Sequence, residues 1–219
     1  TREQMAAILY RYAQYKGYDL TAGGDLSIQY WDGQEPDGLV TQVDGVAAVT
    51  GGISHGAIRE DGSLWVWGAN AEGELGLGIT GYQPEPVKLM EQVAQASFGS
   101  GHMAAVQEDG TLWTWGDNSG GALGNGTTES AMTPVKIMDD VAQVSCNDNT
   151  TLILKTDESV WICGRDFGAG YCLGPNAVDN MSAVPIKVMD DAVYISAGVD
   201  HNAAIKSDGT GGQTAERWA

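Results

Sequence analysis

The chain has 219 residues, of which 31 are Gly, 7 are Trp, 8 are Tyr and only 2 are Phe. This profile is typical of many turns joined by short aromatic strands, and the apolar content of 42% is enough to form a core. The formal net charge of −18 argues against nucleic acid and anionic membrane as partners, because both require a basic surface. No segment is long and apolar enough to span a membrane, and no signal peptide is visible.

Residues 1–22 predict one short α-helix. Thr1 and Gln4 have the spacing of a capping box, and apolar residues recur from Met5 to Tyr12 at intervals of three and four. The stretch "TREQMAAILYRYAQYKGYDL" resembles the helix of an S-layer homology motif. Such motifs tether bacterial surface proteins to wall polysaccharide, and the resemblance implies that Arg2 takes part once the motif is complete. Because the chain begins inside this helix, we expect it to be a piece of a longer product.

Residues 23–38 are rich in Gly and Asp and predict a linker. An internal repeat follows over residues 39–210. Its clearest copies are "EDGSLWVWG", "EDGTLWTWG" and "TDESVWICG", in which Asp61, Asp109 and Asp157 lie 48 residues apart. The units run over about 51–98, 99–146 and 147–197, with a partial unit at 198–210 and an unmatched tail at 211–219. A regular period of this length indicates a repeat architecture.

Each unit predicts four antiparallel strands, which corresponds to one propeller blade. Asp-Gly favours a tight hairpin turn with φ above zero at both central residues. Leu64 and Val66 should point to one face of the sheet, and the following strand should open at Pro86. The tryptophans should point to the other face and form a wedge against the neighbouring blade, and they are Trp65, Trp67, Trp113, Trp115 and Trp161.

These units resemble the regulator of chromosome condensation repeat family, whose blade reads roughly G-x-x-H-x-x-A-L-x-x-D-G-x-V/L-x-x-W-G-x-N-x-x-G-Q-L-G. The first unit matches from Gly52 to Gly76, and the second repeats the pattern. In the third unit a Thr stands near the His position, Glu158 replaces Gly and Cys163 replaces Trp, so we expect a poorer turn and a looser wedge. The resemblance implies a seven-bladed propeller. The predicted fold class is therefore all-β, a partial β-propeller of about three and a half four-stranded blades with one N-terminal α-helix.

The recurring polar residues are interpreted as structural. His55, His102 and His201 are aligned at one equivalent position in three blades, where a ring would hold them apart, so we expect each to bond to backbone within its blade. No catalytic constellation is visible, and we predict neither enzyme activity nor a metal or cofactor. Calcium at "GDNSGG", residues 116–121, stays open beside an ordinary Gly loop.

The three cysteines lack metal-ligand spacing. We interpret Cys146, Cys163 and Cys172 as small buried apolar side chains. A disulfide between Cys163 and Cys172 stays open as an alternative.

The segments that vary between units are better candidates for binding. They are residues 69–85, 117–133 and 165–184, which a rigid propeller would display on its rim and faces. A solvated loop without a partner is the plainer alternative. The predicted protein-binding residues are Glu72, Glu74, Tyr82, Asp117, Asn118, Asp166, Phe167 and Tyr171.

The leading hypothesis is a non-catalytic interaction module of a bacterial secreted or cell-surface protein, located in the cell wall or S-layer. Its partner would be a protein, with wall polysaccharide as a further ligand of the complete N-terminal region. Two alternatives follow from the repeat resemblance. One is a guanine-nucleotide exchange factor-like regulator of a small GTPase, and the other is a secreted enzyme-inhibitor propeller.

Overall fold

The computed structural model describes residues 45–51, 54–165, 180–198 and 202–208, and within these ranges every regular element is a β-strand. The predicted helix and linker, residues 1–38, lie outside the described residues. None of the described residues belongs to a helix that could cross a membrane.

The strands form three four-stranded antiparallel sheets and one two-stranded sheet, each built from consecutive strands. Blade 1 contains β1 (Val46–Gly51), β2 (Ser54–Arg59), β3 (Leu64–Gly68) and β4 (Gln83–Met90). Blade 2 contains β5 (Val93–Phe98), β6 (His102–Gln107), β7 (Leu112–Gly116) and β8 (Ala131–Met138). Blade 3 contains β9 (Val141–Cys146), β10 (Thr150–Lys155), β11 (Val160–Arg165) and β12 (Met181–Met189). Blade 4 contains β13 (Ala192–Ala197) and β14 (Asn202–Lys206).

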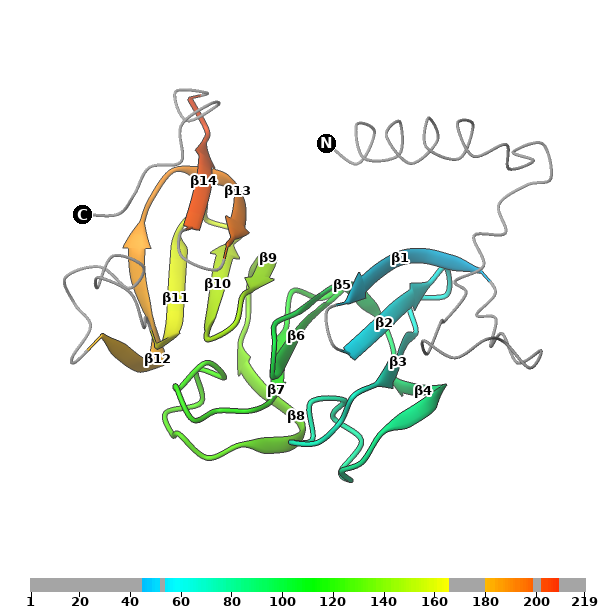
Figure 1. Cartoon of the computed structure of the whole chain (residues 1–219). Helices are drawn as coiled ribbons and strands as arrows, with labels where there is room; N and C mark the ends of the chain where they lie inside the picture. Colours follow the sequence, from blue (N-terminus) through cyan, green and yellow to red (C-terminus); the bar gives the residue numbers. More distant parts are fainter. Residues whose placement is uncertain (1–44, 52–53, 166–179, 199–201, 209–219) are drawn as a thin grey trace.

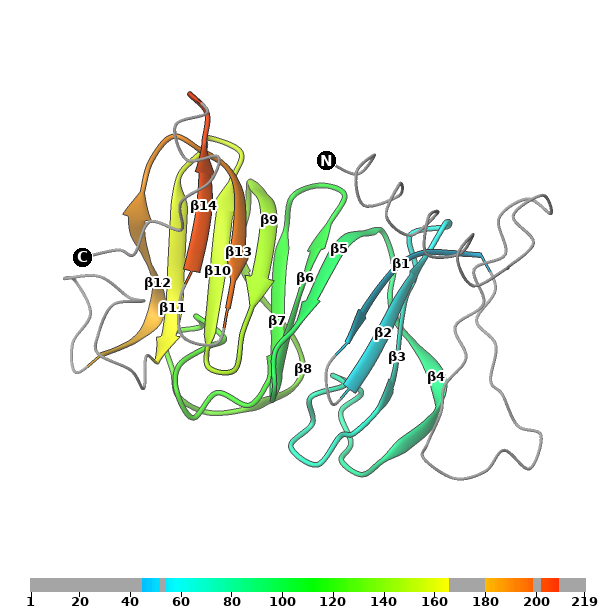
Figure 2. The same ribbon diagram turned by 45° about the horizontal axis from the view of Figure 1, so that its top comes forward.

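The blades follow one another around an arc (Figure 1). The first strand of each blade, β1, β5, β9 or β13, lies on the concave side, and the fourth strands β4, β8 and β12 lie on the convex side (Figures 1 and 2). The sheets are shifted in phase from the repeat units of the sequence, because each unit starts near the second strand and ends with the first strand of the next blade. The structure is therefore a partial propeller with about three and a half blades.

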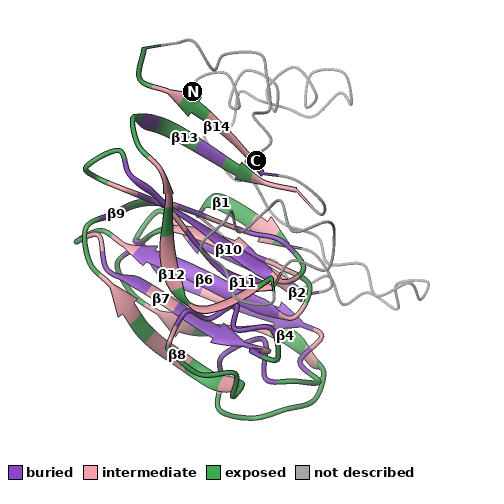
Figure 3. Ribbon diagram, turned by 90° about the vertical axis from the view of Figure 1, so that its left-hand side faces the viewer, coloured by how far each residue is buried: buried purple, intermediate pink, exposed green. Residues whose placement is uncertain are grey.

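Each blade has a forward face, which packs on the next blade, and a backward face, which packs on the preceding one. Leu64 and Val66 of blade 1 share a buried cluster with Met103, Ala105 and Trp115 of blade 2. The next two junctions repeat this arrangement, with Leu112 against Ile153 and with Ile162 against Ile195. Burial is greatest in the second and third strands and least in the convex strands (Figure 3). Stability therefore comes from contacts between blades, because one blade alone buries neither face.

The predicted tryptophan wedge against the neighbouring blade holds for Trp115, whereas Trp67 clusters only with Val46 and Ala57 of its own blade among the described residues. Trp67 and Trp115 are buried, and a Cβ on Gly76 in the preceding blade would lie 2.8 Å from the Trp115 ring, so the two are in close contact. Trp65, Trp113 and Trp161 are only half-buried. Their indole N–H groups donate to the side chains of Ser63, Gln107 and Ser159, so these rings cover the outer part of the blade. Cys163 occupies the wedge position of blade 3 and is buried against the Ala122 carbonyl.

Two local predictions were wrong. The Asp-Gly turn is a four-residue loop in which the Gly62 N–H donates to the Arg59 carbonyl, and φ is positive at Gly62 but not at Asp61. Asp61 instead accepts a hydrogen bond from the Ser63 N–H. Pro86 does not open its strand, because β4 begins at Gln83. Proline is tolerated inside β4 because this is an edge strand with an irregular register between Val66 and Gly68.

Backbone hydrogen bonds tie each link between two blades to the hairpin turn of the blade before it and to that of the blade after it. The Val93 N–H donates to the Gly62 carbonyl, and the Glu108 N–H donates to the Gln92 carbonyl. Asp140 and Asp191 repeat the role of Gln92, and all three have positive φ. Each link therefore connects the hairpin turn of one blade to that of the next.

Concave strands are also joined by a side-chain clamp. The Gln95 carboxamide donates to the Val144 carbonyl at 3.1 Å and accepts from the Val144 N–H at 2.9 Å. Gln143 makes the same pair of bonds to Ile195. The register places Ala48 of β1 where β5 has Gln95, so the first junction lacks this clamp.

Glu158 should be a source of strain in blade 3. It has φ 66°, where the other turns have Gly, yet the turn bonds from its N–H and from Lys155 are retained. We expect Glu158→Gly to raise the free energy of unfolding by about 1 kcal/mol in urea titrations, because Gly removes the Cβ clash of the left-handed conformation.

The matched control is Gly110→Ala, at a position with φ 84° where an added Cβ would meet only ordinary contacts near 3.5 Å. It should lower the free energy of unfolding by a similar amount. Loss of stability in Glu158→Gly would contradict the proposed strain.

Candidate interaction surface

The arc has two faces on which loops gather. The turn face carries the hairpin turns at 60–63, 108–111 and 156–159 and the links at 91–92, 139–140 and 190–191. The loop face carries the Gly-rich loops between the third and fourth strands and the short connections at 99–101 and 147–149. The predicted binding residues that the structure describes fall on the loop face, and they are Glu72, Glu74, Tyr82, Asp117 and Asn118.

On the loop face, many polar side chains form hydrogen bonds within the loops that carry them. Asn118 is fully buried, accepts from the Leu123 N–H and donates to the carbonyls of Thr127 and Glu129. Asn70 does the same in blade 1, accepting from Leu75 and donating to Ile79. The prediction that Asn118 contacts a partner does not fit this burial. Its role is to fix the loop conformation.

The other predicted residues of this face divide by exposure. Glu74 is buried, and its carboxylate accepts from the Glu72 N–H at 2.7 Å, so it too is part of the loop frame. Asp117 is half-buried, and its two oxygens accept from Ser119 and Ser130. Glu72 is exposed, and Tyr82 is 55% exposed. Of these predicted residues, only Glu72 and Tyr82 are thus exposed. Asp166, Phe167, Tyr171 and Arg2 lie outside the described residues.

Two of the three histidines do not occupy equivalent positions. His102 pairs with Gly116, but His55 pairs with Trp67, so the register places Ser54 where blade 2 has His102. His55 lies on the backward face, with its ring 5.9 Å from that of Trp67. His102 lies on the forward face and is 1% exposed. The two histidines are 47 residues apart, one short of the period, so the sequence itself contained the signal of this one-residue shift, which reverses the face. His201 lies outside the described residues.

His102 connects two blades. Its Nε2 lies 2.9 Å from Thr151 Oγ1 of blade 3, and that hydroxyl donates to the Ala122 carbonyl at 2.8 Å. Because the Thr151 hydrogen is used there, Nε2–H of His102 is the donor. The prediction of a backbone partner within the blade was therefore wrong for His102.

The cysteines beside this histidine are not reactive. Cys146 and Cys163 flank Thr151 on the neighbouring strands, and both are buried. Burial raises the pKa of Cys146 to about 12 and raises that of Cys163 further. Within the described part of the chain, no three His, Cys, Asp or Glu side chains are placed to hold a metal ion. Cys172 lies outside the described residues.

The turn face is strongly acidic, although the sequence predicted binding residues only in the variable loops. Paired carboxylates recur at every hairpin turn and at most links, and all are exposed: Glu60, Asp61, Glu91, Glu108, Asp109, Asp139, Asp140, Asp157, Glu158, Asp190 and Asp191. Three lysines, one per blade, pair with Glu91, Asp139 and Asp190, all at exposed positions. The signal in the sequence was the doubled acid at each turn, "ED", "DD" and "DE".

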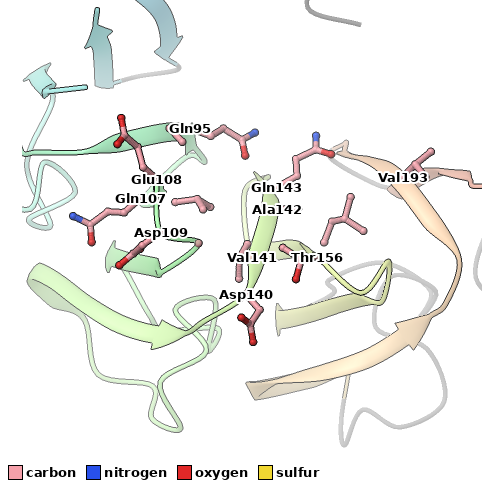
Figure 4. Close-up of a pocket in the computed structure, with 14 residues that line it drawn as sticks. Gln95, Gln107, Glu108, Asp109, Asp140, Val141, Ala142, Gln143, Thr156 and Val193 are labelled. Carbon is pink, nitrogen blue, oxygen red and sulfur yellow. The ribbon is translucent and has the colours of Figure 1, made fainter. Parts of the chain in front are cut away.

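A groove of about 580 Å³ opens on this face between blades 2 and 3. Glu108, Asp109 and Asp140 line it, together with the amide side chains of Gln95 and Gln143, and Figure 4 shows that they come from different elements. The N–H and hydroxyl of Thr111 lower the pKa of Asp109, so this carboxylate is charged at neutral pH. Lys155 lies 3.8 Å from Asp140, beside the groove. The groove is suited to a positively charged group.

The buried His102 should make stability depend on pH. Burial lowers its pKa to about 4, although the charges of Asp117 and Asp148 act in the opposite direction. In the unfolded chain the pKa is near 6.5, so between these values only the unfolded state binds the proton. Stability should be complete above pH 6.5 and fall by about 3 kcal/mol as the pH drops to 4.

Urea titrations across this range test the expectation, with His102→Gln as the comparison. The variant should lose the dependence between pH 6.5 and 5, where the carboxylates stay ionised. An unchanged slope would show that His102 is not its origin.

Comparisons with known proteins agree with this geometry. A model described as the regulator of chromosome condensation (RCC1) repeat matches residues 61–106 and 109–154, and a second RCC1 repeat model matches residues 93–122. No curated protein matches the chain.

Solved structures share the fold. Human WBSCR16 is 24% identical with a TM-score of 0.66, covering 83% of this chain and 47% of that chain. Yeast RCC1 (Prp20), solved bound to Kap60, is 20% identical with a TM-score of 0.64, covering 75% of this chain and 42% of its own. Prp20p from Saccharomyces cerevisiae, described with its binding properties to Gsp1p and histones, gives the same identity and TM-score and is covered over 44%. The chain spans less than half the length of these relatives. Residues 61–154 therefore carry RCC1 repeats, and the described strands form an arc of an RCC1-like propeller.

Proposed function

We propose that this chain is a non-catalytic protein-interaction module whose acidic turn face binds a partner with a basic surface. The observation that carries the proposal is the groove between blades 2 and 3, which is lined by Glu108, Asp109 and Asp140. Carboxylates on this face are exposed and lie on turns that are fixed by hydrogen bonds between blades. A rigid arc of like charge attracts an oppositely charged surface and selects against acidic ones.

The structural relatives support a protein as the partner. Prp20 binds Kap60 in one structure, and Prp20p has been described with Gsp1p and histones. The loop face contributes less to the proposal, because its Asn and Glu side chains are used within the loops.

The proposed setting is the outside of a bacterial cell, as a secreted or wall-bound protein. The support is the resemblance of residues 1–22 to an S-layer homology motif, in which Arg2 would help to bind wall polysaccharide when the motif is complete. Fractionation of the source cells checks this setting, and recovery of the full-length protein only from the cytoplasmic fraction would contradict it.

A second candidate is a regulator of a small GTPase by nucleotide exchange, favoured by the RCC1 repeats and by the relation between Prp20p and Gsp1p. Acceleration of nucleotide release from a small GTPase by the full chain would support it. A rate of nucleotide release equal to the spontaneous rate would exclude the exchange function and leave the interaction module as the proposed function.

Selection of peptides from a displayed random library against the whole chain tests the turn face. We expect the recovered peptides to be enriched in Lys and Arg, because the groove is lined by carboxylates. The double variant Glu108→Gln, Asp140→Asn should weaken their binding by about tenfold or more, as measured by fluorescence anisotropy at fixed salt.

The matched control changes two exposed carboxylates on or near the loop face, Glu72→Gln and Glu85→Gln, and so removes the same charge. It should leave binding within about twofold. Equal losses in both double variants would show a net-charge effect and overturn the assignment to the turn face.

A further inference from the structure

The sequence contains one Asn-Gly pair, Asn125-Gly126. It lies in the Gly-rich loop between β7 and β8 of blade 2, where Asn125 is half-buried and Gly126 is exposed. In such a pair the backbone nitrogen of the glycine can attack the side-chain amide of the asparagine, because Gly has no side chain to hinder the approach. The pair is therefore a candidate for a spontaneous covalent change, deamidation.

The repeat does not require an asparagine at this position. Gly126 of blade 2 and Gly78 of blade 1 are equivalent, since each donates its N–H to the convex strand of the next blade, at 2.8 and 2.7 Å. The residue before Gly78 is Leu77, which packs against the apolar cluster of the first junction. Asn125 is thus a feature of the second blade and not of the architecture.

The side chain of Asn125 is held through its oxygen. Its Oδ1 accepts from the N–H of Thr127 at 3.0 Å, from the hydroxyl of the same residue at 2.9 Å and from Nδ2 of Asn118 at 3.2 Å. A carboxylate offers the same acceptor, and charged acceptors form stronger hydrogen bonds. An aspartate at position 125 therefore fits the loop as it stands.

Asn118 in the same loop shows the opposite requirement. Its Nδ2 also donates to the carbonyls of Thr127 and Glu129, and its Oδ1 accepts from the Leu123 N–H. A carboxylate cannot donate, so an aspartate at position 118 would leave these carbonyls without their donor. The two asparagines thus differ in how well they tolerate deamidation.

Hydrogen bonds hold the reacting atoms of the Asn-Gly pair apart. The Gly126 nitrogen must lose its proton before it attacks, and that proton is donated to the Ala183 carbonyl of blade 3. The Cγ atom of Asn125 must also move onto this nitrogen, so the side chain has to leave the position that its three accepted bonds fix. The reaction therefore requires local opening of the loop away from blade 3.

We propose that Asn125 is a self-modifying site that deamidates when the loop of blade 2 opens from blade 3. The Gly126 nitrogen bonds to Cγ of Asn125, the Cγ–Nδ2 bond breaks, and ammonia leaves with the proton that the Gly126 nitrogen has lost. Water then opens the resulting cyclic imide. Breaking the bond between Cγ and the nitrogen gives aspartate, and breaking the bond between the main-chain carbonyl carbon and the nitrogen gives isoaspartate.

The two products act differently on the junction between blades 2 and 3. Aspartate keeps the bonds from Thr127 and Asn118 and adds one negative charge to the loop face. Isoaspartate lengthens the main chain by one carbon before Gly126 and so shifts this residue from the Ala183 carbonyl, which weakens the contact of the loop with blade 3. The site lies on the loop face and does not depend on the acidic groove.

Incubation of the whole chain in mildly alkaline buffer, followed by peptide mass mapping, tests the proposal. We expect Asn125 to gain the mass that replacement of NH2 by OH causes, and isoaspartyl methyltransferase to label part of the product. Conversion should be slower than in the same chain unfolded in urea, because the folded chain reacts only from the open loop. No conversion in the folded chain while the unfolded chain converts completely would overturn the proposal, and so would equal rates in both.

A pair of threonine variants tests the control by the loop contacts. Thr127→Val removes one bond to Asn125 Oδ1 and should raise the rate of conversion in the folded chain about fivefold. Thr128→Val, at the neighbouring exposed position, is the matched control and should leave the rate unchanged. The same rate in Thr127→Val as in this control would contradict the role of the loop contacts.

A pair of asparagine variants tests how the loop tolerates the product. Asn125→Asp should keep the melting temperature of the chain, whereas Asn118→Asp should lower it, because only the second removes a donor that the loop uses. An equal fall in melting temperature for both variants would show that position 125 also needs its amide, and would overturn the assignment of Asn125 as a site that accepts this change.

Discussion

The structure depends on one constraint, which is that a single four-stranded blade has two apolar faces and can bury neither alone. The forward face of each blade therefore packs on the backward face of the next, and the wedge side chain of the later blade reaches into the loop of the earlier one. Hydrogen bonds add direction to this contact. Links on the turn face and the Gln95 and Gln143 clamps on the concave side hold successive blades at a fixed offset. The arc is thus stabilised by neighbours along the chain, in the manner of repeat proteins.

This use of side chains divides the polar residues into two groups. Those on the loop face, such as Asn70, Asn118 and Glu74, satisfy the backbone of the loops and leave little for a partner. On the turn face one Asp in each hairpin turn accepts from the backbone N–H two residues later, and these residues are Asp61, Asp109 and Asp157. These residues nevertheless stay exposed, as do their acidic neighbours, so the turns hold their charge at the surface.

The junctions are alike in geometry but differ in chemistry. Between blades 1 and 2 the contact is almost wholly apolar, with Trp115 at its centre and Ala48 in place of the glutamine clamp. Between blades 2 and 3, Cys163 replaces Trp and a buried histidine bonds to a threonine. Between blades 3 and 4, the Thr150 hydroxyl and the Asn202 carboxamide are buried without hydrogen-bond partners. The buried His102 makes the second junction sensitive to pH, whereas the first has neither this contact nor the glutamine clamp and is held by apolar packing and the backbone bonds of its link.

Local pattern was enough to predict much of the fold. Four strands per blade followed from the 48-residue period, the turn residues and the alternation of apolar residues with tryptophans. These features could be predicted because they depend on residues within one repeat. The candidate site was predicted less well. His55 and His102 were aligned although they lie one residue short of the 48-residue period and on opposite faces. Asn118 was predicted to bind a partner although its side chain is buried in its own loop. Which carboxylates line the groove and which buried polar groups stay unpaired were decided only by the tertiary structure, because both depend on how one blade is offset against the next.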